Sequence, residues 1–142
     1  MVSPDLTPEP LPGSILKIES APHDWLFPRV SAVVHHGGAG TTAAGLRAGK
    51  PSVIVPFFGD QHFWGRHVHL LGASPKPIPQ KKLTADKLAT AIKETISNPD
   101  IQRKAEDIGE KIRQEDGIGS AVTVIEEIIR NFHSHFADET CS

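Results

Sequence analysis

The chain has 142 residues, 38% of them hydrophobic, and a net charge of −2 at pH 7, which suffices for one buried core and predicts a single domain without a nucleic-acid partner. Its one cysteine, Cys141, cannot form an internal disulfide and fits a reducing compartment. Neither a signal-peptide pattern nor an apolar run long enough to span a bilayer is visible, and we expect a cytoplasmic protein.

The first segment of the chain is rich in proline and glycine. Residues 1–14 therefore predict a flexible leader, ahead of an α/β domain over residues 15–133 and a tail over residues 134–142. Residues 15–18 alternate enough between apolar and polar side chains to predict a short strand. Residues 21–29 predict a loop with one helical turn, because a proline near each end limits a longer helix.

The central feature of the sequence is a strand, a glycine turn and the start of a helix. Residues 32–35 predict a strand, because valine favours an extended backbone. Three glycines follow within four positions, beginning at Gly37, and a helix is expected over about residues 41–48 with Thr41 near its cap. Backbone N–H groups converge at such a turn, and the helix dipole adds about half a positive charge, so the turn suits a phosphate group.

The next stretch continues the alternation of strand and helix. Gly49 is expected to end the first helix, and the mostly apolar residues 52–55 predict a strand covered on both faces. Residues 61–71 predict a helix that ends at Gly72. Residues 76–79 predict an edge strand, because prolines are tolerated at the edge of a sheet.

The remaining sequence predicts three helices. Thr84 caps the first, Asn98-Pro99 separates it from the second, and Gly117 with Gly119 precedes the third. Apolar residues recur at helical spacing in each, which predicts faces turned toward a core and no chemistry. These positions are Leu88, Ile92 and Ile96 in the first helix, Ile101, Ala105, Ile108 and Ile112 in the second, and Val122, Ile125, Ile128 and Ile129 in the third.

Strands that alternate with helices predict an α/β fold with a Rossmann-like parallel sheet flanked by helices. Such sheets bind ligands beyond the carboxyl ends of their strands. Both the glycine turn and the pair Asp60-Gln61 follow a predicted strand. We therefore expect the two motifs to share one crevice.

The glycine turn also fits a second pattern. Residues 38–43 match the dinucleotide fingerprint G-x-G-x-x-A, and Asp60 follows about twenty residues later. In that pattern the acidic residue ends the next strand, whereas Asp60 lies beyond it, in a loop that opens another helix. The fingerprint also leaves the two histidines before the glycines unexplained, so a nicotinamide-binding domain is the weaker hypothesis.

Four motifs together carry a more specific resemblance. They are residues 21–30, the histidine–glycine turn 35–42, the Gly-Lys-Pro of residues 49–51 and the Pro-Phe-Phe-Gly-Asp-Gln of residues 56–61. At these spacings the chain resembles the donor-binding part of family 1 UDP-glycosyltransferases, above all the sterol glucosyltransferases of fungi and plants, over about residues 15–129. The resemblance implies the C-terminal part of a GT-B glycosyltransferase that transfers glucose from UDP-glucose to a lipid hydroxyl, most of all a sterol, with inversion and without a metal or cofactor.

The resemblance also implies roles for individual residues. The imidazole of His36 contacts the diphosphate of the donor beside the glycine turn, and Asp60 with Gln61 holds the transferred glucose. The structural alternative for the aspartate is a helix start, and His35, on the opposite strand face from His36, is expected to be a packed histidine. The donor-binding candidates are His36, Gly37, Gly38, Ala39, Gly40, Thr41, Thr42, Asp60 and Gln61, and the candidate nucleoside contacts are Ser20, Ala21 and His23.

Two further groups of side chains carry weaker expectations. No metal site is expected, because His62, His67 and His69 do not share one helix face and no cysteine or carboxylate completes a set at the usual spacings. A lysine cluster forms either a solvated face or a peripheral contact with an anionic membrane, which would suit a sterol acceptor. The cluster consists of Lys76, Lys81, Lys82 and Lys87.

The family places its acceptor pocket and its general base in an amino-terminal domain, and nothing in this sequence resembles that domain. No catalytic residue is therefore assigned to this chain, which by itself is expected to be inactive. We expect the missing acceptor domain, or a partner chain that supplies it, to complete the enzyme. The alternative is a non-catalytic nucleotide-sugar-binding module, or a donor subunit that regulates or completes a partner chain.

Overall fold

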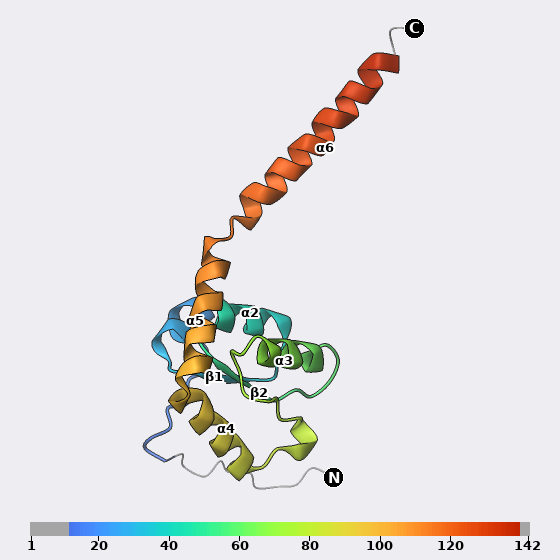
Figure 1. Ribbon diagram of the computed structural model, residues 1–142. Coiled ribbons are helices and arrows are strands. Elements are labelled where there is room, and N and C mark those ends of the chain that lie inside the picture. Colours follow the sequence, from blue (N-terminus) through green and yellow to red (C-terminus); the bar gives the residue numbers. More distant parts are fainter. Residues whose placement is uncertain (1–11, 140–142) are drawn as a thin grey trace.

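The computed structural model describes residues 12–139, with side chains through residue 132. Short strands and helices alternate along the chain, and the last helix projects from the rest (Figure 1). The elements are α1 (His23–Leu26), η1 (Phe27–Arg29), β1 (Val33–His35), α2 (Ala39–Arg47), β2 (Ser52–Ile54), α3 (Gln61–Leu70), η2 (Gln80–Lys82), α4 (Ala85–Ser97), α5 (Pro99–Gln114) and α6 (Gly117–Glu139).

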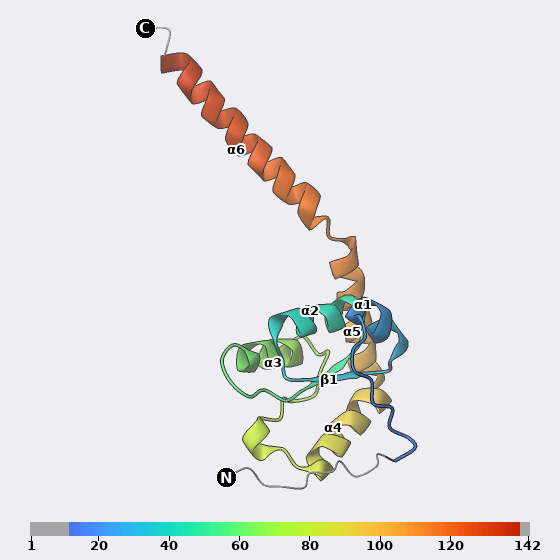
Figure 2. The ribbon, with the colours of Figure 1, turned by 180° about the vertical axis from the view of Figure 1, so that it is seen from behind.

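The two strands form a parallel pair in which Val34 of β1 lies opposite Val53 of β2. The helix α2 connects them, and α2 and α4 lie on opposite sides of the pair (Figures 1 and 2). A strand–helix–strand unit with parallel strands is the building block of α/β folds. The predicted α/β class, with a parallel sheet flanked by helices, is therefore confirmed.

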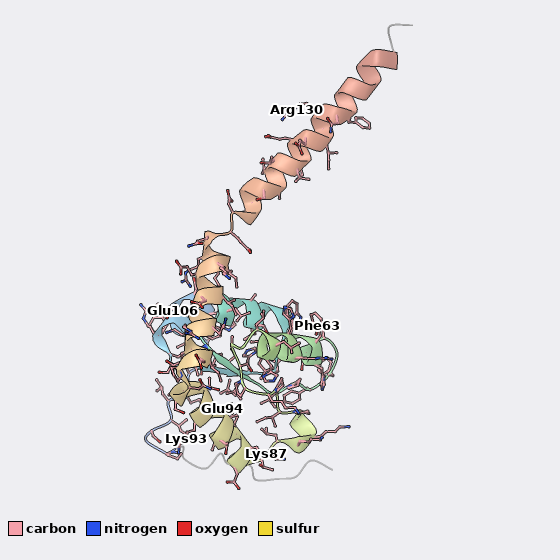
Figure 3. All side chains as sticks on the ribbon, in the orientation of Figure 1. Phe63, Lys87, Lys93, Glu94, Glu106 and Arg130 are labelled. Atoms are coloured by element: carbon pink, nitrogen blue, oxygen red, sulfur yellow. The ribbon has the colours of Figure 1, made fainter. Side chains whose placement is uncertain are left out.

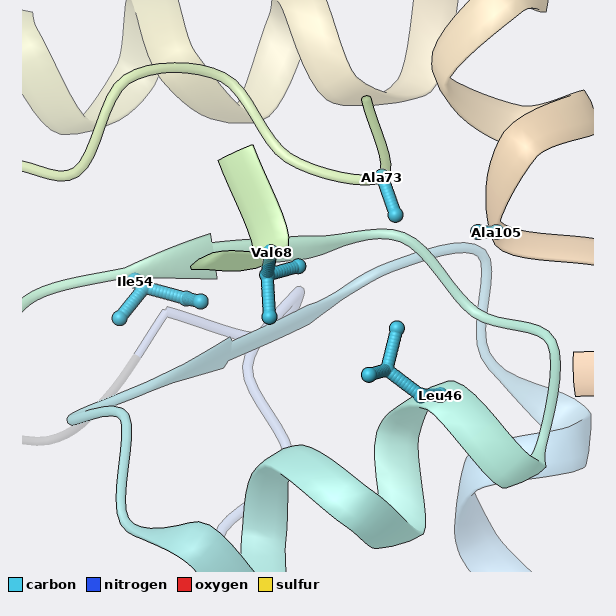
Figure 4. Close-up of a cluster of buried hydrophobic side chains, with 5 residues drawn as sticks. All are labelled: Leu46, Ile54, Val68, Ala73 and Ala105. Atoms are coloured by element: carbon cyan, nitrogen blue, oxygen red, sulfur yellow. The ribbon is translucent and has the colours of Figure 1, made fainter. Parts of the chain in front are cut away.

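The hydrophobic core joins the second strand to helices from distant parts of the sequence. All three residues of β2 are buried, as expected for a strand that is covered on both faces. The core thus anchors β2, and with it the carboxyl end of the strand pair. Its central side chains are Leu46, Ile54, Val68, Ala73 and Ala105 (Figure 4).

Helix boundaries follow the predicted caps. The hydroxyl of Thr84 accepts a hydrogen bond from the Lys87 amide at 3.3 Å and starts α4. The side-chain oxygen of Asn98 accepts from the Asp100 amide at 3.0 Å and starts α5. Gly49 follows α2 with a φ of +68°, a conformation that glycine adopts readily. At these three positions the local sequence was sufficient to predict the helix boundary.

The strand predicted over residues 15–18 is wrong. This segment is irregular, and the side chain of Leu16 is 85% exposed. Neither β1 nor β2 pairs with it. An alternating pattern does not make a strand unless a neighbour takes up the backbone N–H and C=O groups.

The edge strand predicted over residues 76–79 is also not formed, although the segment runs alongside β2. The Ile78 amide donates to the Ile54 carbonyl and the Gln80 amide donates to the Pro56 carbonyl, both at 3.0 Å. Prolines occupy every second position of the segment and have no N–H. The segment therefore takes the place of an edge strand, with only isolated hydrogen bonds, and offers few donors to a further strand.

The apolar face predicted for the last helix exists, but the prediction that it faces the core is wrong. In Figures 1 and 2, α6 extends away from the strands and from α2 to α5. Helical periodicity identifies an apolar face and does not identify what covers it. Its exposed side chains include Ile118, Val122, Val124, Ile125 and Ile128, with exposed fractions between 47% and 82%.

The predictions for the two ends of the chain can be compared with the structure to different extents. The tail predicted from residue 134 begins inside α6, which continues to Glu139. Most of the predicted leader, residues 1–11, lies outside the described residues. Within the described part, no helix is both long and apolar enough to cross a membrane.

Candidate functional site

The amino terminus of α2 follows the carboxyl end of β1, with only residues 36–38 between them. Gly38 is the N-cap, with φ −62° and ψ 142°, and no side chain caps the helix there. The first helical hydrogen bond runs from the Thr42 amide to the Gly38 carbonyl at 2.9 Å. The amides of the three residues between them, Ala39, Gly40 and Thr41, therefore have no acceptor within the helix. Unsatisfied amides at the positive end of a helix dipole form a site for an anion.

The helix begins two residues earlier than the predicted start at Thr41. The extended conformation of Gly38 lets the chain turn into the helix at Ala39, so Gly40 is a residue of the first helical turn. A Cβ on Gly40 would have no described heavy atom within 4 Å apart from its own neighbours and helix backbone. The space in front of Gly40 is thus open, as an approach path for an anion requires.

Gly37 connects the turn to the second motif. Its φ of +90° is unfavourable for residues with a Cβ. A Cβ there would also lie 2.9 Å from Cγ2 of Ile54 and 3.0 Å from the carbonyl oxygen of Gln61. The glycine turn is therefore packed against the start of α3, and the predicted convergence of the two motifs is observed.

The imidazole of His36 lies over the N-cap of α2. A Cβ built on Gly38 would be 2.5 Å from Nε2 of His36, so the absence of a side chain on Gly38 leaves room for this ring. The His36 side chain is exposed. An imidazole and the first amides of a helix thus border the same open space, and both can donate hydrogen bonds to an anion.

The neighbouring His35 points to the other face of β1 and is largely buried. Its Nδ1 accepts a hydrogen bond from the Gly37 amide at 3.1 Å. The pKa of His35 is lowered to about 4, mainly by burial and to a smaller extent by the charges of His36 and His23. The prediction of a packed His35 did not include its hydrogen bond to the turn, because sequence spacing does not reveal such a contact.

Asp60 and Gln61 stand at the start of α3 but differ in their surroundings. Asp60 is exposed, and its carboxylate accepts a hydrogen bond from Nε1 of Trp64 at 3.2 Å. Gln61 is only 8% exposed, and its Oε1 accepts from the amides of Phe57 and Phe58 at 2.8 and 3.3 Å. The amide oxygen of Gln61 therefore holds the loop before α3.

Two of the predicted site residues lie away from the open space. The hydroxyl of Thr42 is buried, with no hydrogen-bond partner among the described residues. His23 stacks on Phe27 with ring centroids 4.4 Å apart, and it lines a cavity of about 690 Å³ with Ala44 and Arg47 of α2. The structure thus groups His23 with the later half of α2.

The loop 56–60 displays apolar side chains beside Asp60. Phe57 and Phe58 are 56% and 74% exposed, and Phe63 is 61% exposed. Phe63 lies on the first turn of α3 (Figure 3). The hydrogen bond from Gln80 to Pro56 places η2, with Lys81 and Lys82, next to this loop. Within the described part of the chain, no group of three His, Cys, Asp or Glu residues could hold a metal ion.

Comparisons with known proteins place this geometry in a family. Residues 4–129 match the family described as "Erythromycin biosynthesis protein CIII-like, C-terminal domain". A sterol 3-beta-glucosyltransferase of Arabidopsis thaliana is 43% identical over 129 residues, which cover 91% of this chain and 20% of that protein. One from Yarrowia lipolytica is 49% identical over 116 residues, covering 82% and 8%. The chain thus spans a small part of the length of these relatives.

Solved structures with similar folds are glycosyltransferases. The glycosyltransferase VinC, in complex with DTDP, has a TM-score of 0.72 and 28% identity, over 84% of this chain and 31% of that chain. The kitacinnamycin glycosyltransferase has a TM-score of 0.77 and 27% identity, over 87% and 32%. The spinosyn forosaminyltransferase SpnP, at 21% identity and a TM-score of 0.79, supports the fold alone.

Proposed function

This chain belongs to the glycosyltransferase family of the erythromycin biosynthesis protein CIII-like C-terminal domain, and we propose that it is the donor-binding part of a UDP-glycosyltransferase. The donor would be UDP-glucose and the acceptor a lipid hydroxyl, most of all that of a sterol. Relatives that are 43% and 49% identical and are named sterol 3-beta-glucosyltransferases support this choice of substrate class. Membership of the GT-B fold supports a site that lies between this part and a second domain.

The observation that carries the proposal is the open amino terminus of α2 beneath the imidazole of His36. In glucosyl transfer, the acceptor oxygen forms a bond to the anomeric carbon while the bond from that carbon to the diphosphate breaks. The electron pair of the broken bond goes to the diphosphate, whose negative charge rises. The amides of Ala39, Gly40 and Thr41 and an N–H of His36 would donate to that charge. Attack opposite the leaving group inverts the anomeric configuration.

The residues at the start of α3 would bind the transferred sugar. The exposed carboxylate of Asp60 can accept hydrogen bonds from sugar hydroxyls, and the NH₂ of Gln61 can donate one. Because Gln61 also anchors the loop through its Oε1, its contribution to the donor site would be partly structural. A resident metal is not part of the proposal, because the helix terminus and His36 supply the positive potential.

The acceptor hydroxyl needs a base and a pocket, and we assign neither to this chain. The base would take the proton of the acceptor hydroxyl within hydrogen-bond reach. We propose that the acceptor domain, or a partner chain that contains it, supplies both. The part of the relatives that this chain matches is 20% and 8% of their length, and the remainder has room for such a domain. The second candidate, a nucleotide-sugar-binding module without catalysis of its own, would use the same open amino terminus of α2.

We further propose a cytoplasmic location with a peripheral membrane contact through Lys81 and Lys82. The hydrogen bond between Gln80 and Pro56 brings the segment of these lysines to the loop that carries the exposed Phe57 and Phe58. Basic and aromatic side chains together suit the surface of an anionic bilayer. Such a contact would bring the donor site near a membrane-bound sterol. Binding to anionic and neutral vesicles, compared directly, would test it.

Two measurements test the proposed function. Calorimetry with UDP, UDP-glucose and NAD should detect binding of the first two and none of the third. Labelled UDP-glucose and ergosterol should yield sterol glucoside only when an acceptor domain from a relative is added as a second polypeptide. Tighter binding of NAD than of UDP would refute the donor assignment, and product from this chain alone would refute the need for a complement.

A further inference from the structure

The end of β1 contains a hydrogen bond that runs backward along the chain. The ring of His35 bends toward the turn, and its Nδ1 accepts the N–H of Gly37, two residues later, at 3.1 Å. The backbone of His35 is held independently, because its carbonyl accepts from the Val55 amide of the neighbouring segment at 2.9 Å. The imidazole is therefore attached to a paired strand and reaches the turn from a fixed position.

This contact defines the chemical form of the ring. A nitrogen that accepts a hydrogen bond carries no proton, so the proton of the neutral imidazole is on Nε2. Nε2 is buried, with no hydrogen-bond partner among the described residues. Protonation of Nδ1 would turn the acceptor into a donor that faces the Gly37 N–H. The turn geometry therefore requires a neutral His35.

The bond to His35 also divides the amides of the turn into two sets. The Gly37 amide points inward to the ring, whereas the amides of Ala39, Gly40 and Thr41 at the start of α2 are left for a ligand. On its other side Gly37 is confined by Ile54 and by the carbonyl of Gln61. With both sides held, the turn has little freedom to rotate its peptide planes.

We propose that His35 is a positioning residue of the glycine turn, whose imidazole holds the Gly37 amide inward and thereby sets the direction of the His36 ring and of the first α2 amides. His35 would not touch the donor itself. The ligand in this inference, a diphosphate, rests on the proposed function, whereas the geometry of the turn does not.

The test compares replacements that differ in the position of one acceptor atom. His35→Asn keeps an oxygen where Nδ1 was, at the same number of bonds from the backbone. His35→Leu has no acceptor, and His35→Gln places its oxygen one bond farther, in the direction of Nε2. If the leucine variant does not fold, the asparagine and glutamine variants carry the same comparison.

The first readout is amide hydrogen exchange by NMR, with the Val55 amide as an internal reference for strand pairing. In the leucine and glutamine variants, exchange of the Gly37 amide should accelerate by about tenfold relative to Val55, which corresponds to one neutral hydrogen bond. The asparagine variant should stay within about threefold of the wild type. A ratio that is the same in all three variants and the wild type would overturn the proposal.

The second readout is the affinity for UDP, measured by calorimetry. The leucine and glutamine variants should bind UDP about tenfold more weakly, and the asparagine variant should recover most of the loss. Equal weakening in all three would contradict a positioning role that depends on the acceptor. If the wild type does not bind UDP, the proposed function fails, and the exchange ratio together with the chemical shifts of the α2 amides still decides the role of His35.

A matched control is available on α3. Nδ1 of His69 lies 3.0 Å from the carbonyl oxygen of Ser74, a histidine–backbone contact away from the turn. His69→Leu should lower the thermal stability but leave the Gly37-to-Val55 exchange ratio and the UDP affinity unchanged. A change in either quantity in this control would show that loss of stability alone produces the effect.

Discussion

The backbones of Gly37 and Gln61 meet at the carboxyl end of the strand pair. A Cβ on Gly37 would lie 3.0 Å from the carbonyl oxygen of Gln61, closer than carbon and oxygen normally approach. These residues are 24 positions apart and belong to two motifs that local sequence does not connect. Their contact brings the candidate phosphate-binding turn and the candidate sugar-binding pair together as one candidate site.

The first prediction separates two glycines of the turn. Gly37→Ala should lower the free energy of unfolding by about 2–4 kcal/mol, because the new Cβ adds strain at positive φ and a clash with Ile54 and Gln61. Gly40→Val should fold, because a Cβ there meets open space, but it should abolish UDP binding by filling that space. Urea unfolding and calorimetry on both variants check this. Unchanged UDP affinity in a folded Gly40→Val protein would disprove the anion site at α2.

The second prediction concerns the sugar. Asp60→Ala should weaken binding of UDP-glucose by about 1.5–3 kcal/mol more than binding of UDP. The reason is that UDP lacks the glucose hydroxyls from which the carboxylate would accept hydrogen bonds. Trp64→Phe is the control, because it removes the indole N–H that contacts Asp60 and keeps an aromatic side chain, while the Asp60 carboxylate stays in place. Calorimetry with both ligands provides the numbers. If UDP and UDP-glucose lose affinity equally, Asp60 has a structural role only.

The third prediction is a dependence of stability on pH. The pKa of His35 is about 4 in the folded chain against 6.5 for an exposed histidine, through burial first and then the charges of His36 and His23. Between these values the unfolded chain binds a proton that the folded chain does not. The contribution of His35 is therefore complete above pH 6.5 and is lost as the pH falls toward 4, by about 3 kcal/mol.

Urea unfolding of the wild type and of His35→Asn, at several pH values between 4 and 7.5, measures this contribution. Asparagine does not titrate, so the variant should lose less stability than the wild type as the pH falls through this window. Parallel stability curves for the two proteins would show that His35 is protonated equally in the folded and unfolded states.

The fourth prediction concerns the exposed apolar face of α6. A helix with Val122, Ile125 and Ile128 in water should lead the isolated chain to associate at micromolar to millimolar concentrations. A double replacement, Ile125→Glu with Ile128→Glu, should favour the monomer, whereas the control Glu127→Gln should not. Sedimentation velocity distinguishes the species. Equal association of the control and the double variant would assign self-association to another surface, such as Phe57 and Phe58.

Much of the fold could be predicted because its signals are local. The caps at Thr84 and Asn98 and the glycine after α2 act within a few residues, where backbone sterics and nearby hydrogen bonds decide the conformation. The α/β class followed from the alternation of such elements. The strand prediction for residues 15–18 was wrong because a strand requires a pairing partner, and the sequence of the segment does not specify one.

By itself the sequence determined the strand, the glycine turn and the helix start, because β-branched residues and glycines restrict or release φ and ψ at each position. Only the tertiary structure decided what each polar side chain does there. Gln61 is committed to the loop amides and His35 to the Gly37 amide, and the face of α6 remains exposed. These outcomes depend on which distant segments pack together, since burial and hydrogen-bond satisfaction belong to the assembled surfaces and not to the local chain.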